Sequence, residues 1–164
     1  MGYKLGTRSL KRLVGVHPDL VKVVKRAIEI TKQDFSVGEG LRSEARQLVL
    51  YNKGKSTTMN SRHLTGHAVD LFPYPFNGDV DEDGIPNIED WDQYYPIADA
   101  MKQAARELGV DLEWGGAWHI SPLHSWGGSA KSATEDYVKL RQSQGRKAFL
   151  DGPHFQLSWE NYPK

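Results

Sequence analysis

Residues 61–72 read SRHLTGHAVDLF, a polar segment that runs directly into an apolar strand. Because side chains alternate along a strand, Val69 and Leu71 are expected on one face and Asp70 on the other. A carboxylate in an apolar strand is costly unless it is paired or bound to a cation. This stretch therefore predicts one strand of the sheet and, on one face of that strand, a functional site.

The rest of the chain mixes helical and strand patterns. Apolar residues at helical spacing predict helices over 18–32, 43–53, 95–108 and 134–144. Short β-prone runs predict further strands over 34–37, 110–114 and 155–158, with a turn over 38–40 after the first of them. Ser43 is expected to cap the second helix and Gly109 to end the third. Since regular strand–helix–strand units are missing, the pattern indicates a mixed α+β fold.

Composition narrows the function. The 164 residues fit one domain, 1–164, and 21 Lys plus Arg balance 21 Asp plus Glu. Because the chain has no excess of positive charge to attract phosphates, nucleic-acid binding is not expected. The chain has no Cys, so a metal site would have to use His, Asp, Glu or backbone oxygens.

The amino-terminal residues contain no apolar stretch typical of a secretion signal, and no run approaches the roughly 20 apolar residues of a membrane span. We therefore expect a monomer that is made in the cytoplasm without a signal peptide. If its target lies outside the membrane, another factor has to release it.

Two histidines accompany Asp70. His63 precedes the strand, and His154 follows a Gly-Pro turn much later in the chain. Two His and one Asp form a three-ligand set that leaves a fourth position for water, as in catalytic zinc sites. His63, Asp70 and His154 are therefore candidate zinc ligands. An alternative pairs His63 with His67 at helical spacing, but Gly66 and the following strand argue against a helix here.

Asp151 lies three residues before His154, with Gly152 and Pro153 forcing a turn between them. That turn can aim both side chains at one point. A carboxylate beside a metal-bound water is a natural general base, so Asp151 is the candidate base. The alternative is an ordinary aspartate in a surface turn, which is the commoner role for Asp in such a sequence.

Residues 79–90, DVDEDGIPNIED, match a calcium-loop pattern. The candidate ligands are Asp79, Asp81, Asp83, Asn87 and Asp90. Asp at the last position is shorter than the usual Glu, and no helix clearly precedes the loop. The alternative is a solvated acidic turn that caps the third helix. Calcium here would be structural or regulatory rather than catalytic.

Several motifs together resemble one enzyme family. The pattern S-x-H-x-x-G-x-A-x-D over 61–70, followed by D-x-x-H over 151–154, resembles that of VanX/VanY-type zinc D,D-peptidases and L-alanyl-D-glutamate peptidases. The segments 17–20 (HPDL), 40–43 (GLRS) and 114–118 (WGGAW) extend the resemblance over most of the chain. Small phage endolysins are the most similar members. The resemblance implies a small antiparallel sheet flanked by helices, with a hedgehog/D-Ala-D-Ala peptidase-like fold.

Residue by residue, the resemblance implies zinc on the three candidate ligands and Asp151 as the base. It also implies that Arg42 binds the substrate carbonyl and the developing oxyanion, and that Ser61 hydrogen-bonds the substrate or a ligand. An ordinary solvated Arg at a helix start is the alternative for Arg42. Many members carry Glu where this chain has Asp151. Residues 119–147, which contain His119, His124 and Trp126, are expected to be an insertion that forms a lid or shapes the cleft.

The function that follows is zinc-dependent hydrolysis of peptidoglycan at the L-Ala to D-Glu bond of the stem peptides, leading to lysis of the host. One alternative is a D,D-carboxypeptidase or dipeptidase that acts on D-Ala termini. An alternative from another class is a non-catalytic zinc-containing domain for wall binding or signalling.

Overall fold

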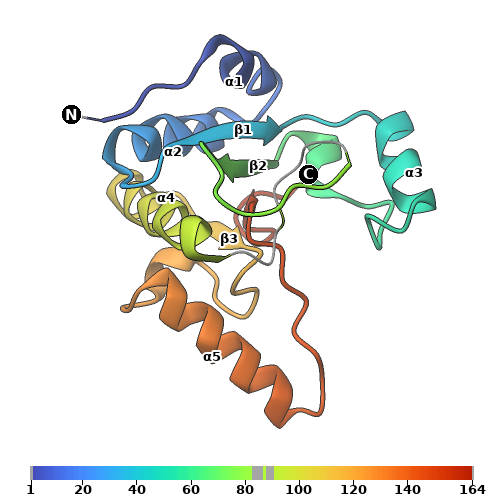
Figure 1. The fold of residues 1–164 in the computed structure, drawn as a ribbon, viewed down its shortest axis with the longest axis vertical. Coiled ribbons are helices and arrows are strands. Elements are labelled where there is room, and N and C mark those ends of the chain that lie inside the picture. Colours follow the sequence, from blue (N-terminus) through green and yellow to red (C-terminus); the bar gives the residue numbers. More distant parts are fainter. Residues whose placement is uncertain (1, 83–86, 88–90, 164) are drawn as a thin grey trace.

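The computed structural model describes residues 2–82, 87 and 91–163. Four antiparallel strands form one sheet in the order β1 (Phe35–Glu39), β2 (Ala68–Pro73), β4 (His154–Leu157) and β3 (Leu112–Trp114). β2 and β4, which are far apart in the sequence, are the two central strands. The predicted α+β fold with a small antiparallel sheet is confirmed (Figure 1).

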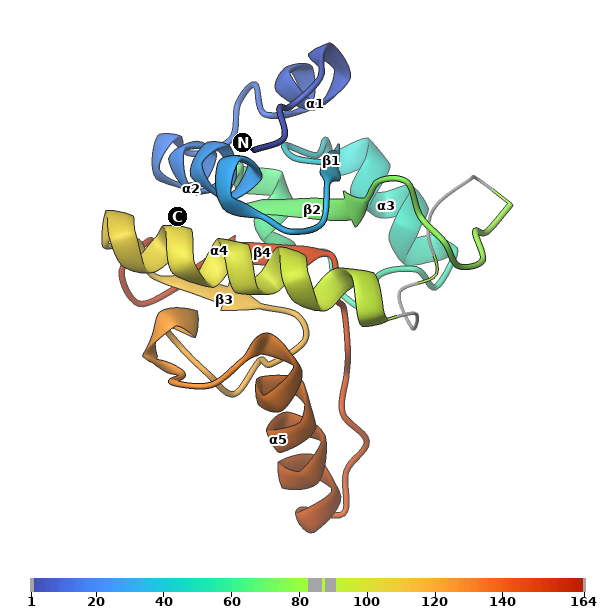
Figure 2. The ribbon, with the colours of Figure 1, turned by 60° about the vertical axis from the view of Figure 1, so that its left-hand side comes forward.

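In the described residues, five helices accompany this sheet: α1 (Thr7–Arg12), α2 (Pro18–Ile30), α3 (Glu44–Asn52), α4 (Tyr94–Leu108) and α5 (Ala130–Ser143). Short 3-10 turns lie at η1 (Arg62–Thr65), η2 (Trp91–Gln93) and η3 (Leu123–Ser125). α2 and α4 pack against each other beside the sheet, whereas α5 projects away from the body (Figure 2). Within the described ranges, no helix is both long enough and apolar enough to cross a membrane.

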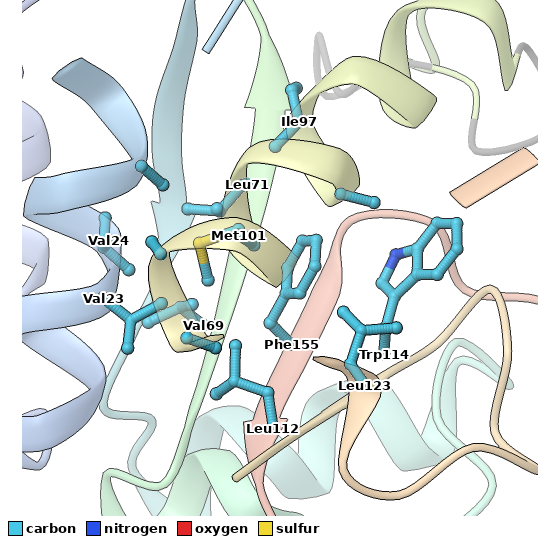
Figure 3. Packing of buried hydrophobic residues seen from close by; sticks show 14 of the residues in the cluster. Val23, Val24, Val69, Leu71, Ile97, Met101, Leu112, Trp114, Leu123 and Phe155 are labelled. Carbon is cyan, nitrogen blue, oxygen red and sulfur yellow. The ribbon is translucent and has the colours of Figure 1, made fainter. Parts of the chain in front are cut away.

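The apolar core lies between the sheet and the two packed helices. Figure 3 shows Val23 and Val24 of α2 close to Met101 of α4. Val69 and Leu71 of β2 belong to the same cluster, and all five side chains are fully buried. Because this face of β2 is committed to the core, Asp70 lies on the opposite face of the sheet, as the alternation predicts.

Several elements differ from the prediction. β1 continues to Glu39, where a turn was expected, and its register shifts between Val37 and Glu39. Gly38 lies at this irregularity because a Cβ there would come within 2.1 Å of the Phe72 ring. α5 begins at Ala130 instead of residue 134, since the Ser129 hydroxyl caps it by accepting from a backbone N–H. The six-residue helix α1 was not predicted.

Candidate metal centre

Asp70 lies in a row of polar side chains that crosses the sheet. It pairs with Glu39 of β1 on one side and with His154 of β4 on the other. The register shift at Gly38 brings Glu39 opposite Asp70, so the bulge contributes directly to the site. Three strands from distant parts of the sequence therefore place ionisable side chains next to one another.

His63 joins this row from η1, and the three predicted ligands form a compact group that we call the triad. Asp70 Oδ1 lies 3.3 Å from His63 Nε2 and 3.4 Å from His154 Nδ1. The candidate ligand atoms all lie within 4.8 Å of one another. The two imidazole rings stand edge to face with centroids 5.1 Å apart. The structure therefore brings together the residues that the sequence predicted.

Each histidine of the triad has one ring nitrogen held by the protein. His63 Nδ1 lies 2.8 Å from the Gly40 carbonyl oxygen, and His154 Nε2 lies 2.8 Å from Gln156 Oε1. Both partners accept hydrogen bonds, so these nitrogens carry protons, and the opposite nitrogens, which face Asp70, are the ones left to bind a metal. Within the described part of the chain, buried His63 Nε2 and Asp70 Oδ1 have no hydrogen-bond partner. Buried polar atoms left in this way fit a metal ion.

Electrostatics favour a cation at the same point. Burial would raise the pKa of Asp70, but His63 and His154 outweigh it and hold the pKa well below its usual range. Burial would lower the pKa of His154, but the neighbouring carboxylates of Asp70 and Asp151 raise it to about 9. The pocket therefore keeps its carboxylate ionised and attracts positive charge.

Asp151 lies beside the triad at the entry to β4. Burial, followed by the nearby charge of Asp70, raises the pKa of Asp151. The backbone of Asp151 is fixed by its N–H, which donates to the Gly115 carbonyl at 2.9 Å. A Cβ on Gly115 would collide with the Asp151 carbonyl oxygen at 2.0 Å, which explains this glycine of the WGGAW segment. The alternative of a solvated aspartate in a surface turn does not fit, because the charges of Asp70, His154 and His63 all act on the Asp151 carboxyl group.

Arg42 is buried next to the same group. Its guanidinium donates to both carboxylate oxygens of Glu39, at 2.8 and 2.6 Å, and to Gln47 Oε1 at 2.7 Å. It lies 3.8 Å from Asp70 Oδ2. The alternative of an ordinary solvated arginine is wrong, since the side chain is held on three sides in a fixed orientation.

Ser61 and His67 occupy different positions around η1. The Ser61 hydroxyl accepts from the His63 backbone N–H at 3.2 Å and lines a shallow hollow together with Arg42. His67 Nδ1 is bonded to Thr65 Oγ1 at 2.6 Å, and its ring packs against His17. The alternative pairing of His63 with His67 is therefore not formed, although η1 is a short helical turn where the sequence predicted none.

Gln156 and Glu113, which lie behind the site, were not singled out from the sequence, and Trp118 was named only as part of the WGGAW segment. Gln156 and Glu113 form a hydrogen-bonded chain behind His154. Trp118 packs against His154 with ring centroids 5.4 Å apart. A signal for Gln156 existed, because it follows His154 by two residues in a strand and therefore shares its face. Glu113 could not be found in this way, because the sequence did not predict which strand pairs with the strand that carries Glu113.

The candidate calcium loop lies partly outside the described residues. Asp83 and Asp90 are outside them, whereas Asp79, Asp81 and Asn87 are described. The Asn87 backbone N–H donates to the Asp79 carbonyl at 2.8 Å, and Asp81 lies 3.7 Å from Lys55 Nζ. Calcium binding here stays a prediction.

Comparison with known proteins identifies the family. A family model described as phage L-alanyl-D-glutamate peptidase matches residues 1–158. The L-alanyl-D-glutamate peptidase of Escherichia phage T5 is 35% identical over 124 residues, covering 74% of this chain and 85% of that protein. The crystal structure of the L-Ala D-Glu endopeptidase ChiX of Serratia marcescens superposes with a TM-score of 0.67 at 40% identity, covering 96% of this chain and 92% of ChiX.

These matches agree with the fold and the site in defining the class of protein as peptidases. Within that class, the chain belongs to the phage L-alanyl-D-glutamate peptidase family.

Proposed function

We propose that this protein is a zinc endopeptidase that hydrolyses the L-Ala to D-Glu bond of peptidoglycan stem peptides and thereby lyses the host cell. The observation that supports it most is the triad, which leaves His63 Nε2 and Asp70 Oδ1 buried without hydrogen bonds in a chain of this peptidase family. His, Asp and His are a ligand set typical of catalytic zinc. The enzyme would act on the wall after release by another factor.

Zinc, when bound by the triad, would supply Lewis acidity toward the scissile carbonyl and toward water. Asp151 accepts the proton of the attacking water and delivers it to the leaving amine. Its raised pKa suits the first of these steps, because a carboxylate of higher pKa is a stronger base and accepts the proton of water more readily. Burial beside Asp70 is the cause of that shift.

Arg42 and Ser61 bind the substrate in this scheme. Both line the same hollow, and Arg42 links this hollow to Glu39 and Asp70, with which its guanidinium forms ion pairs. Glu39 and Gln47 hold the Arg42 guanidinium in place, so its charge is oriented before substrate arrives and can stabilise a developing oxyanion. Ser61 also fixes the turn that carries His63.

Digestion of purified peptidoglycan followed by mass spectrometry tests the proposal. We expect peptides with a newly exposed D-Glu amino terminus and glycan strands that retain L-Ala. Release of free D-Ala would instead indicate a D,D-carboxypeptidase. Zinc binding without any released product would indicate the non-catalytic alternative.

We also propose that residues 79–90 bind calcium as a structural or regulatory ion. The support is the ligand spacing and the hydrogen bond from the Asn87 backbone N–H to the Asp79 carbonyl oxygen. Calorimetric titration should give calcium-dependent heat in the wild type and a weaker response in Asp81→Ala. Absence of heat in the wild type would end the idea.

A further inference from the structure

Gln156 is a buried amide in a central strand, and its two ends contact different partners. Its Oε1 lies 2.8 Å from His154 Nε2, and its Nε2 donates to Glu113 Oε1 at 2.9 Å. Gln156 is 7% exposed and pairs with Glu113 across β3 and β4. An uncharged polar side chain at such a position is costly unless both of its ends are bonded, as they are here.

The order of these bonds fixes the direction of each donor. An ionised Glu113 carboxylate only accepts, so it draws the NH₂ end of the Gln156 amide and leaves the carbonyl end facing His154. That carbonyl oxygen also only accepts, so His154 Nε2 must carry a proton. His154 Nδ1 is then the nitrogen that turns its lone pair toward Asp70 when the imidazole is neutral.

From this geometry we infer that Glu113 and Gln156 are positioning residues that set the tautomer of His154. Without them, the Asp70 carboxylate, 3.4 Å from Nδ1, would favour the proton on Nδ1 and block that nitrogen as a ligand. The inference rests on the proposed zinc site. It adds that metal affinity depends on two residues that are not themselves ligands.

Zinc affinity, measured by competition with a chromophoric chelator, tests the inference on the full chain. We expect Gln156→Leu to weaken zinc binding about 10- to 100-fold, the usual cost of losing such a partner of a ligating histidine. Gln93→Leu is the matched control, because Gln93 also makes side-chain hydrogen bonds but makes them to Asn77 and Pro75 at η2. The control should bind zinc like the wild type.

Two further variants separate positioning from general stability. Glu113→Gln keeps an acceptor for the Gln156 amide and should bind zinc more tightly than Glu113→Leu, which removes it. Nitrogen-15 NMR of the zinc-free protein, at a pH where His154 is neutral, should report the proton on His154 Nε2 in the wild type and a shift of this proton toward Nδ1 in Glu113→Leu. A change in folding stability alone would not move this signal.

The inference is overturned if Gln156→Leu and Glu113→Leu both bind zinc as tightly as the control. It is also overturned if NMR places the His154 proton on Nδ1 in the wild type. A wild type that binds no zinc at all would refute the proposed function instead, so the two failures are distinguishable.

A separate observation concerns the projecting arm formed by α5 and the segment that returns from it to β4. Residues 138–150 contain Lys139, Arg141, Arg146 and Lys147 and no Asp or Glu. Lys139, Arg146 and Lys147 are exposed, whereas Arg141 lies over the Tyr137 ring. The first half of α5 adds Lys131, Glu135 and Asp136, so the excess of positive charge is confined to residues 138–150, the last part of α5 and the return segment. Because the whole chain has zero net charge, the remaining residues carry a net negative charge.

The arm also leads to the site. Its return segment runs from the tip of α5 toward the start of β4, where Asp151 and His154 lie (Figure 2). Phe149, which is 58% exposed, lies in this return segment. We propose that the arm is a second contact with the anionic substrate polymer, binding free carboxylates of peptidoglycan stem peptides. This proposal rests on the proposed function and gives the chain a wall-binding surface.

Binding to purified sacculi over a range of salt concentrations tests the arm. The triple variant Lys139→Glu, Arg146→Glu, Lys147→Glu should lower binding at low salt on the order of tenfold, from three surface charges reversed. Cleavage of a small soluble muropeptide should stay at the wild-type rate. A matched control reverses Lys4, Lys22 and Lys25, which are exposed lysines of the amino-terminal segment and α2.

Equal sacculus binding by the arm variant and the control would overturn the arm proposal. So would a loss of binding to vesicles of anionic phospholipid without any loss on sacculi, which would assign the arm to a membrane. Failure of the wild type to cleave the soluble muropeptide would count against the proposed function rather than the arm.

Discussion

The protein contains two groups of histidine and aspartate that use the same residue types in different ways. In the triad, His63 and His154 face a common carboxylate, and buried His63 Nε2 and Asp70 Oδ1 stay without hydrogen bonds among the described residues. At the base of α5, His119 Nε2 lies 2.8 Å from Asp136 Oδ2, and the Asp136 side chain is 51% exposed.

The difference teaches how to separate a binding site from a structural ion pair. Buried His119 Nδ1 also has no hydrogen-bond partner among the described residues, but the only carboxylate bonded to this histidine is half exposed. One histidine and one solvated aspartate are too few ligands for a metal site, so this pair is an ordinary ion pair. The triad is buried and incompletely bonded, so a cation lowers its energy. Residue type and sequence spacing do not distinguish the two groups, whereas burial and the direction of each ring nitrogen do.

Removal of a triad side chain should have the largest effect. His63→Ala should abolish stoichiometric zinc binding and lower kcat/KM for muropeptide cleavage by more than about 10²-fold, since even an indirect partner of a zinc ligand costs up to that much. His119→Ala is the matched control and should retain both zinc and activity. Equal losses in the two variants would remove the distinction between the groups.

Asp151→Asn should rank next. The amide keeps the size of the carboxylate but cannot accept the proton, so kcat should fall about 10²- to 10⁴-fold while zinc content stays at the wild-type level. Single-turnover kinetics and elemental analysis of the same preparation measure both quantities. A variant that loses its zinc would place Asp151 among the ligands instead.

Zinc should also stabilise the fold through the triad and not through the His119–Asp136 pair. A ligand that binds the folded state alone at 1,000 times its Kd adds about 4 kcal/mol to the free energy of unfolding. Thermal unfolding with zinc and after chelation should therefore differ clearly in the wild type and in His119→Ala, and not in His63→Ala. A zinc effect that survives in His63→Ala would point to another binding site.

The smallest effect is expected at the His119–Asp136 pair itself. Asp136→Asn keeps the shape of the side chain and removes its charge, so urea unfolding should lose at most about 1 kcal/mol, as for other partly exposed pairs. Activity on a soluble muropeptide should not change. A loss of several kcal/mol would mean that this pair, too, is a buried and essential contact.

Much of the fold was predictable because local patterns set it. The apolar stripe of α2 and the alternation of β2 follow directly from periodicity, and Ser43 and Gly109 act as the predicted cap and helix end. The start of α5 was misplaced because Ser129, which caps it, precedes the apolar residues that were used to detect the helix. The predicted turn at Gly38 was wrong, because a glycine within a strand can also mark a bulge, and here it lies under the Phe72 ring.

The candidate ligands were predictable in type, since an aspartate in an apolar strand requires compensation and the chain contains no cysteine. The role of their neighbours was not. Glu39 and Gln47 orient Arg42, and Glu113 acts on His154 through Gln156, across strands that are distant in the sequence. Such contacts depend on strand order and register, which short-range patterns leave undetermined.

The sequence by itself determined which faces of its strands are apolar, that Asp70 points away from the core, and which residue types could hold a metal. It also named His63 and His154 as the candidate partners of Asp70, but only the tertiary structure decided how the three side chains meet and which nitrogen each ring presents. The physical reason is that periodicity acts within a few residues, whereas a ligand set is assembled by the pairing of β2 with β4 and by the hydrogen bonds that their neighbours then impose.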